Sequence, residues 1–215
     1  AEEHKADARD AVIAFINEVA LAMINATPKL YVRINSLSTL HGLEDLLALA
    51  KRPGKLTGLL IPKSESADEI ALIANLLADA VCDIELIPLI ETQVGVRNAA
   101  ALAGSSPVVA ALFLGSVDLS GELGSNMEWD ALVRARTKLV EAASEHGLDC
   151  MDGPWLSRDD SAGLRTEAAR VAAMGFTGKA SYHAGQIPHI HAAFTPSADA
   201  VAEVKRILEN GAADT

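Results

Sequence analysis

Aromatic residues and cysteines are scarce in this chain, and these shortages limit the classes of protein to which it can belong. Phe, Trp and Tyr together make up 4% of the 215 residues. The two cysteines, Cys82 and Cys150, stand far apart with no CxxC spacing. This pattern disfavours a disulfide framework and a cysteine-ligated metal site. We expect two buried, reduced thiols.

Positive charge and long apolar runs are also in short supply. Lys and Arg number 18 against 29 Asp and Glu, for a formal net charge of -11, which argues against nucleic acid or an anionic membrane as the main partner. No apolar run reaches the roughly 18 residues that a membrane span needs, and no signal peptide opens the chain. We therefore predict a cytoplasmic protein with neither of those partners.

What the sequence does contain is a regular alternation of strand-like and helix-like segments. Six apolar runs predict strands at 30–35, 57–62, 84–91, 108–115, 148–153 and 176–182. Amphipathic segments rich in Ala and Leu lie between them, at 42–50, 67–81, 95–102, 129–146 and 163–174. Runs such as LTGLLIP and IELIPLI are apolar at consecutive positions, which is typical of parallel strands buried on both faces.

Alternation of this kind predicts either a doubly wound open sheet or a (β/α)₈ barrel. Six strands are visible, whereas a barrel has eight. The opening segment, AEEHKADARDAVIAFINEVALAMI, is already helical in pattern, with acidic residues in its first turn. A helix in that place implies a preceding strand. Periodicity alone leaves both folds open.

Charged and polar residues follow the strand-like runs, where parallel α/β proteins gather their reactive groups. In chain order they are Arg33, Asn35, Lys63, Glu91, Asp118, Asp152, Lys179 and His183. Arg33 interrupts what reads as a buried strand, YVRINSLST, and a buried guanidinium needs an anionic partner. Others have ordinary structural interpretations: Glu91 as a first-turn helix carboxylate, Asp118 as a helix cap and Lys63 as a solvated loop residue.

Glu91 and Asp118 nevertheless close two successive strands, which are usually neighbours in a parallel sheet. Two carboxylates one strand apart suit Mg²⁺, which takes one or two protein carboxylates and leaves its other positions to water or substrate oxygens. The six histidines form no HExxH or Cys/His pattern, so zinc is not indicated. Gly95 and Gly115 would let the backbone come close to a ligand. Nucleotide-binding glycine loops and a GxSxG elbow are absent from the sequence.

Six segments carry a family resemblance: YVRINSLST, LLIPKSES, LIPLIETQVGVRNA, ALFLGSVDLSGELG, MDGPW and GFTGKASYHAGQIPHIHAAFTPS. Their order and spacing resemble the citrate lyase β-subunit-like family, which includes malyl-CoA lyases and belongs to the HpcH/HpaI aldolase superfamily. The resemblance covers essentially the whole chain. It implies an α/β fold of the (β/α)₈ TIM barrel type, with a single barrel domain over residues 1–215 whose first two strands precede Ala1.

The resemblance also implies roles for individual residues. Glu91 and Asp118 are the expected Mg²⁺ ligands, and Arg33 is expected to hold the oxygens of an oxoacid or its enolate. Further substrate contacts are expected from four residues: Lys63, Gly115, Ser116 and Val117. The loop SYHAGQI departs from the family's pattern, because Tyr182 and Ala184 stand where Ile and Pro are usual, and the general acid and base stay unassigned.

The implied activity is that of a Mg²⁺-dependent carbon–carbon lyase. It would cleave or form a 3-hydroxyacyl-CoA thioester such as citryl-CoA or malyl-CoA by a retro-Claisen or retro-aldol step. One alternative is an aldolase that acts on a free hydroxy-oxoacid and gives pyruvate or a similar ketoacid. Another is a non-catalytic barrel that serves as a binding or scaffold subunit. The resemblance also implies a homo-oligomer, a trimer or a multiple of three.

Overall fold

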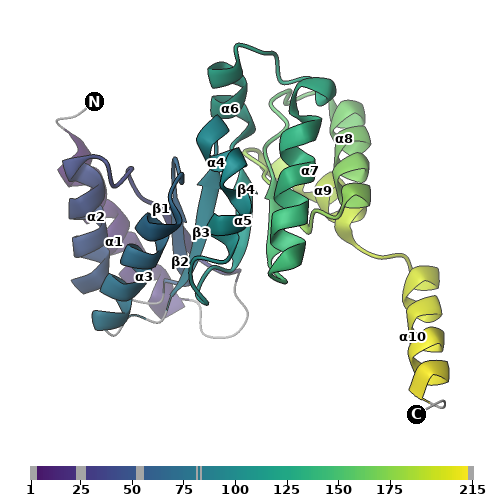
Figure 1. The fold of residues 1–215 in the computed structure, drawn as a ribbon, viewed down its shortest axis with the longest axis horizontal. Coiled ribbons are helices and arrows are strands. Elements are labelled where there is room, and N and C mark those ends of the chain that lie inside the picture. The colour runs from purple at the N-terminus through teal and green to yellow at the C-terminus, as the bar shows by residue number, and fades with distance from the viewer. Residues whose placement is uncertain (1–3, 23–27, 52–55, 81, 83, 213–215) are drawn as a thin grey trace. The chain divides into compact units, whose positions relative to one another are not determined.

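The structure is a computed structural model that describes residues 4–22, 28–51, 56–80, 82 and 84–212 (Figure 1). Its strands are β1 (Tyr31–Arg33), β2 (Gly58–Ile61), β3 (Glu85–Ile90), β4 (Ala111–Leu114), β5 (Asp149–Asp152) and β6 (Gly178–Lys179). The longer helices are α1 (Lys5–Ala22), α2 (Leu40–Lys51), α3 (Ala67–Asp79), α7 (Trp129–Glu145), α8 (Ser161–Met174) and α10 (Ala198–Ala212). The shorter ones are α4 (Gln93–Arg97), α5 (Ala99–Ala103), α6 (Ser116–Leu123), α9 (Ile187–Phe194) and the 3₁₀ turn η2 (Ala184–Gln186).

The chain divides into two compact units, residues 1–153 and 154–215. In the first unit β1 to β5 pair as parallel neighbours in chain order. Ile90, at the end of β3, is in register with Leu114, at the end of β4. The side chains that follow these two strands therefore start from the same edge of the sheet, as predicted. The second unit contains β6, α8, α9 and α10, and α8 packs on α9.

The predicted (β/α)₈ TIM barrel is wrong. The described residues contain six strands, and the sheet of the first unit is open and curled (Figure 1). A closed barrel needs eight strands, each paired on both sides. Within the described part of the chain, β1 pairs with β2 alone, so the ring of hydrogen bonds is not completed. Over the described residues, the strands form an open parallel sheet that resembles half of a barrel.

The core is aliphatic, as the runs of consecutive apolar residues predicted. Leu86 to Ile90 of β3 are all buried, and Leu112 and Leu114 of β4 are fully enclosed. Helix α3 covers the sheet with Ile70, Ile73 and Leu77, whose spacing places them on one helical face. Cys82 and Cys150 are both buried, as expected. Among the described residues no helix combines the length and apolar character needed to cross a membrane.

Candidate active site

Glu91 follows β3 directly and is only 5% exposed. Its Oε1 accepts a hydrogen bond of 2.9 Å from the backbone N–H of Lys63, in the turn after β2. On the other side lies Gly115: a Cβ added there would be 2.3 Å from the Glu91 Cβ and 3.0 Å from Oε2. Any side chain at position 115 would therefore displace the Glu91 carboxylate. This close approach to Glu91 requires a glycine, whereas the sequence suggested an approach of the backbone to a ligand.

The charges of three other predicted site residues act on the Glu91 carboxylate. Burial raises the pKa of Glu91 above its ordinary value, and the hydrogen bond from the Lys63 amide lowers it. The negative charge of Asp118 raises the pKa further, whereas the positive charges of Lys63 and Arg33 lower it. The net shift is upward. The structure thus brings Arg33, Lys63 and Asp118 into electrostatic reach of one buried carboxylate.

Arg33 is the last residue of β1 and differs from its expectation in one respect. The sequence predicted a buried guanidinium, but Arg33 is exposed, and Tyr31 and Val32 before it are only half-buried. The prediction was wrong because β1 has one strand neighbour among the described residues, so it is not covered on both sides. The Arg33 side chain has no hydrogen-bond partner within that part of the chain. Its charge is therefore available to an anion from outside.

The remaining predicted contacts come from the start of α6. Gly115 is the N-cap, and Asp118 is an exposed residue of the first turn, where a carboxylate suits the helix dipole. Val117 is exposed, whereas Ser116 is 1% exposed, and its Oγ has no hydrogen-bond partner among the described residues. Gly153, after β5, leaves room for Ser116: a Cβ there would be 2.1 Å from that Oγ.

Glu91 and Asp118 suit Mg²⁺ better than they suit a metal ion whose ligands all come from the protein. The described residues contain no group of three or more His, Cys, Asp and Glu side chains able to hold a metal ion. Mg²⁺ needs fewer, because it keeps waters and substrate oxygens in most of its positions. Glu91 Oε2 faces Gly115 and is not hydrogen-bonded within the described residues. Carboxylates such as those of Glu91 and Asp118 are of the donor type that Mg²⁺ takes.

Other strand-end residues from the sequence have structural partners. Asp152 is fully buried and forms an ion pair with Arg136 of α7, with Nε and Oδ1 2.9 Å apart. In the second unit, Lys179 Nζ lies 2.7 Å from Glu167 Oε1 of α8. His183 accepts a hydrogen bond from the Gly185 N–H and caps η2. Each of these charged or polar groups is used within its own unit.

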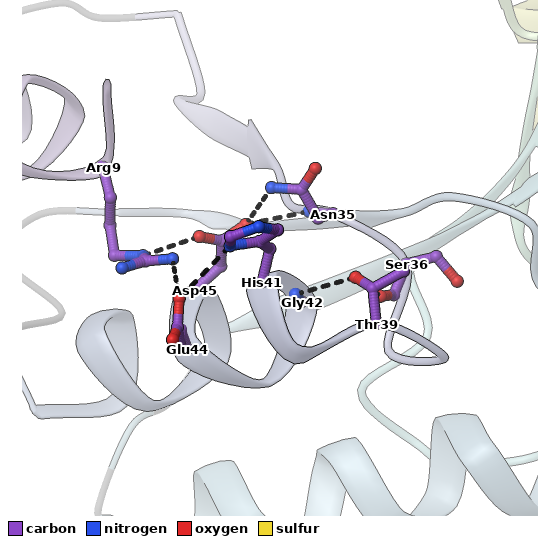
Figure 2. A network of polar contacts seen from close by, with 8 residues as sticks. All are labelled: Arg9, Asn35, Ser36, Thr39, His41, Gly42, Glu44 and Asp45. Atoms are coloured by element: carbon purple, nitrogen blue, oxygen red, sulfur yellow. Dashed lines mark hydrogen bonds and ion pairs between the residues drawn. The ribbon is translucent and has the colours of Figure 1, made fainter. Parts of the chain in front are cut away.

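Sequence reasoning missed Asp45, a buried carboxylate in α2. Figure 2 shows it in a network with Arg9, Asn35 and Glu44. A signal was present, because Asp45 shares the spacing of the buried residues Gly42, Leu46 and Leu49. A carboxylate on the apolar face of a helix indicates a hydrogen-bonded partner inside.

The sequence profile of the HpcH/HpaI aldolase/citrate lyase family matches residues 1–184. The chain belongs to this family. It is 37% identical over 168 residues to a (3S)-malyl-CoA thioesterase of Cereibacter sphaeroides, an alignment that covers 77% of this chain and 56% of the relative. It is 28% identical over 234 residues to an L-malyl-CoA/beta-methylmalyl-CoA lyase of the same species, covering 97% of this chain and 72% of the relative. The chain thus spans little more than half the length of the thioesterase relatives that it matches.

Among solved structures, the chain is similar to the protein CitE of Mycobacterium tuberculosis in complex with magnesium, acetoacetate and coenzyme A. The TM-score is 0.76 at 29% sequence identity, and the match covers 99% of this chain and 75% of that one. Family membership confirms the resemblance seen in the strand-end segments.

Proposed function

We propose that this chain carries the site of a Mg²⁺-dependent carbon–carbon lyase acting on a 3-hydroxyacyl-CoA thioester such as malyl-CoA or citryl-CoA. The observation that carries the proposal is the buried Glu91 carboxylate with Asp118, Arg33 and Lys63 in electrostatic reach. Membership in a family of aldolases and lyases supports it. So does the relative named as a malyl-CoA lyase, together with the magnesium, acetoacetate and coenzyme A bound to the CitE structure.

Glu91 and Asp118 would hold the metal. Bound there, Mg²⁺ would polarise the carbonyl that forms when the carbon–carbon bond breaks. The Lys63 amide contacts Glu91 on one side and Gly115 lies on its other side, which supports this role. The exposure of Asp118 leaves space beside it for water and for substrate oxygens.

Arg33 and the start of α6 would hold the oxoacid part of the substrate. A guanidinium pairs with a carboxylate through two parallel hydrogen bonds, and it stabilises charge that develops on an enolate or alkoxide oxygen. The free N–H groups at a helix N-terminus bind anions. In this proposal the backbone at Gly115, Ser116 and Val117 fixes the substrate carboxylate, while Lys63 contributes positive charge at the edge of the site.

Cleavage breaks the bond between the hydroxyl-bearing carbon and the carbon next to the thioester carbonyl. The hydroxyl proton leaves to a base, and the electron pair of the broken bond moves into the thioester enolate, which is then protonated. The products of malyl-CoA would be glyoxylate and acetyl-CoA.

Hydrolysis of the same thioester is a second candidate function. It is favoured by one observation: the relatives named (3S)-malyl-CoA thioesterase are 34% to 37% identical to this chain, against 28% for the lyase. The same residues would bind the malyl group, but water would attack the thioester carbonyl and release malate and free coenzyme A.

A product assay separates these functions. With (3S)-malyl-CoA and Mg²⁺, the lyase produces glyoxylate and acetyl-CoA and no free thiol, whereas the thioesterase produces malate and one free thiol per turnover. We expect glyoxylate, and we expect EDTA to abolish its formation. Cleavage of free hydroxy-oxoacids instead of the thioester would identify an aldolase. Binding without turnover of either class would identify a non-catalytic subunit.

Lys63 provides a sharper test of how Glu91 is held. It is the one described non-glycine residue with positive φ, at 51°, a conformation that costs an ordinary residue about 1 kcal/mol or more. We expect Lys63→Gly to retain Mg²⁺ affinity and Lys63→Val to lower it about tenfold, because a β-branched residue resists this conformation and pulls the amide away from Glu91. Both variants remove the same charge. Equal Mg²⁺ dissociation constants by calorimetry would contradict the prediction.

Two broader expectations continue as proposals. We infer that the protein self-associates, as a trimer or a multiple of three, and that it acts in the cytoplasm on an oxoacid and a CoA thioester.

A further inference from the structure

We propose that Asp45 is a positioning residue for Arg33: it holds the segment that follows β1, and so sets where the Arg33 guanidinium meets the oxoacid. This inference rests on the proposed function, because it takes Arg33 as a substrate contact. Asp45 itself touches neither metal nor substrate. It acts through the backbone two residues after Arg33.

The Asp45 carboxylate links three elements of the first unit (Figure 2). Its Oδ2 accepts two hydrogen bonds from Asn35, one of 3.0 Å from the backbone N–H and one of 2.6 Å from Nδ2. Its Oδ1 accepts a hydrogen bond of 2.7 Å from Nε of Arg9 in α1. One carboxylate in α2 therefore fastens the end of β1 to two helices.

The same segment is held on its other sides as well. The Ile34 N–H donates to the Leu60 carbonyl oxygen at 3.3 Å, which continues the β1–β2 pairing. The first turn of α2 presses on the loop at Gly42, where an added Cβ would lie 2.2 Å from the Ser36 carbonyl oxygen. Asn35 is thus clamped between strand pairing before it and helix contact after it.

The contacts that hold Asn35 form a clamp on the segment after β1. The position of Arg33 depends on this clamp more than that of an arginine with its own hydrogen-bond partner would. Its side chain has no hydrogen-bond partner among the described residues, so its backbone is the part of Arg33 that those residues hold in place. A cavity of about 150 Å³ lies beside it, lined in part by Arg33, Asn35 and Asp45. Loosening the segment would give the guanidinium room to move away from Glu91.

Asp45 is both buried and charged, so its role is more than to fill space in the core. Burial raises the pKa of Asp45, but the hydrogen bonds from Asn35 and Arg9 outweigh this and lower the pKa overall. The neighbouring Glu44 also accepts a hydrogen bond from Arg9, with Arg9 Nη2 and Glu44 Oε2 2.7 Å apart. Glu44 is exposed, and its hydrogen bonds are to Arg9 and His41, so it is a matched control for loss of a charge facing Arg9.

The test compares Asp45→Asn with Glu44→Gln by calorimetry. Each protein is titrated with Mg²⁺ alone and with glyoxylate or oxaloacetate in saturating Mg²⁺. We expect Asp45→Asn to weaken oxoacid binding about tenfold with Mg²⁺ affinity unchanged, and Glu44→Gln to leave both unchanged. Asn35→Ala, which removes the side-chain half of the clamp, is expected to show the same selective loss and serves if Asp45→Asn folds poorly.

A double-mutant cycle decides whether Asp45 acts through Arg33. In an Arg33→Ala background, Asp45→Asn should have no further effect on oxoacid binding. An equal loss in both backgrounds, a parallel loss of Mg²⁺ affinity, or normal oxoacid binding in Asp45→Asn would overturn the inference while the proposed function stands. Unchanged oxoacid binding in Arg33→Ala itself would overturn the proposed function and the inference together.

Discussion

Glu91→Gln is expected to abolish Mg²⁺ binding and to reduce cleavage of the thioester about a thousandfold or more. The substitution keeps the size of the side chain and an oxygen able to accept the Lys63 hydrogen bond. It removes one of the two carboxylates that we propose as metal ligands, and a neutral amide is a poorer ligand for a hard cation. Calorimetric titration with Mg²⁺ and the glyoxylate assay measure the two losses.

Glu85→Gln is the matched control for this prediction. Glu85 begins the same strand, β3, at the opposite end from Glu91, and binds Lys29 and Tyr31 through its carboxylate. The variant should keep Mg²⁺ affinity and turnover. Equal losses in both variants would show that the charge of β3, and not a metal site after it, is what matters.

Glu91→Gln should also stabilise the metal-free protein at neutral pH, opposite in sign to its effect on activity. The pKa of Glu91 is raised in the folded state above its ordinary value of 4.5. A raised carboxyl pKa favours folding below the unfolded value, and this benefit is lost as the pH rises through the folded pKa. At pH 7 the charged group therefore opposes folding, and Gln removes that penalty.

Thermal unfolding with EDTA and with Mg²⁺ tests the sign. The Glu91→Gln variant should melt above the wild type in EDTA, and Mg²⁺ should raise the melting temperature of the wild type alone. Mg²⁺ affinity of the wild type should fall as the pH drops through the raised pKa, since protons compete for the carboxylate. A metal-free variant less stable than the wild type would identify Glu91 as a structural carboxylate.

The strands were predictable because their pattern is local. The run at 84–91 contains β3 at Glu85–Ile90, and the run at 148–153 contains β5 at Asp149–Asp152. Apolar side chains at consecutive positions already encode burial on both faces. Closure of the sheet is not local, because it depends on which strand pairs with β1, and no periodicity within a segment carries that information. Periodicity left the question open, and the closed barrel that the family resemblance implied is not what the described strands form.

The site was only partly predictable for a related reason. Glu91 and Asp152 look alike in the sequence, each an acidic residue at the end of an apolar strand. The structure separates them: Glu91 is left with neighbouring like charge from Asp118, whereas Asp152 meets Arg136, which lies on a helix 16 residues earlier. Which way such a side chain turns depends on the packing of α7 against the sheet. Sequence spacing gives the strand end but not the partner.

Asp152→Ala is expected to lower the free energy of unfolding by about 3–5 kcal/mol. Arg136 and Asp152 are 2% and 0% exposed, with Nε–Oδ1 and guanidinium–Oδ2 distances of 2.9 and 3.3 Å. The guanidinium carbon also lies 4.7 Å from the centroid of the Trp129 ring. Without Asp152, the buried Arg136 guanidinium loses this carboxylate but stays enclosed in the core, and that loss destabilises the fold. Urea unfolding measures the change.

Glu203→Ala is the control, because Glu203 makes a two-point pair with Arg206 of comparable geometry on the exposed face of α10. No measurable change is expected there, since water solvates an exposed arginine that loses its partner. The double variant Arg136→Met/Asp152→Leu should recover most of the stability that Asp152→Ala loses, because apolar groups of similar size replace both charges. A double variant as unstable as Asp152→Ala would contradict this account and would mean that the pair fixes the packing of α7 on β5 in a way that apolar side chains cannot.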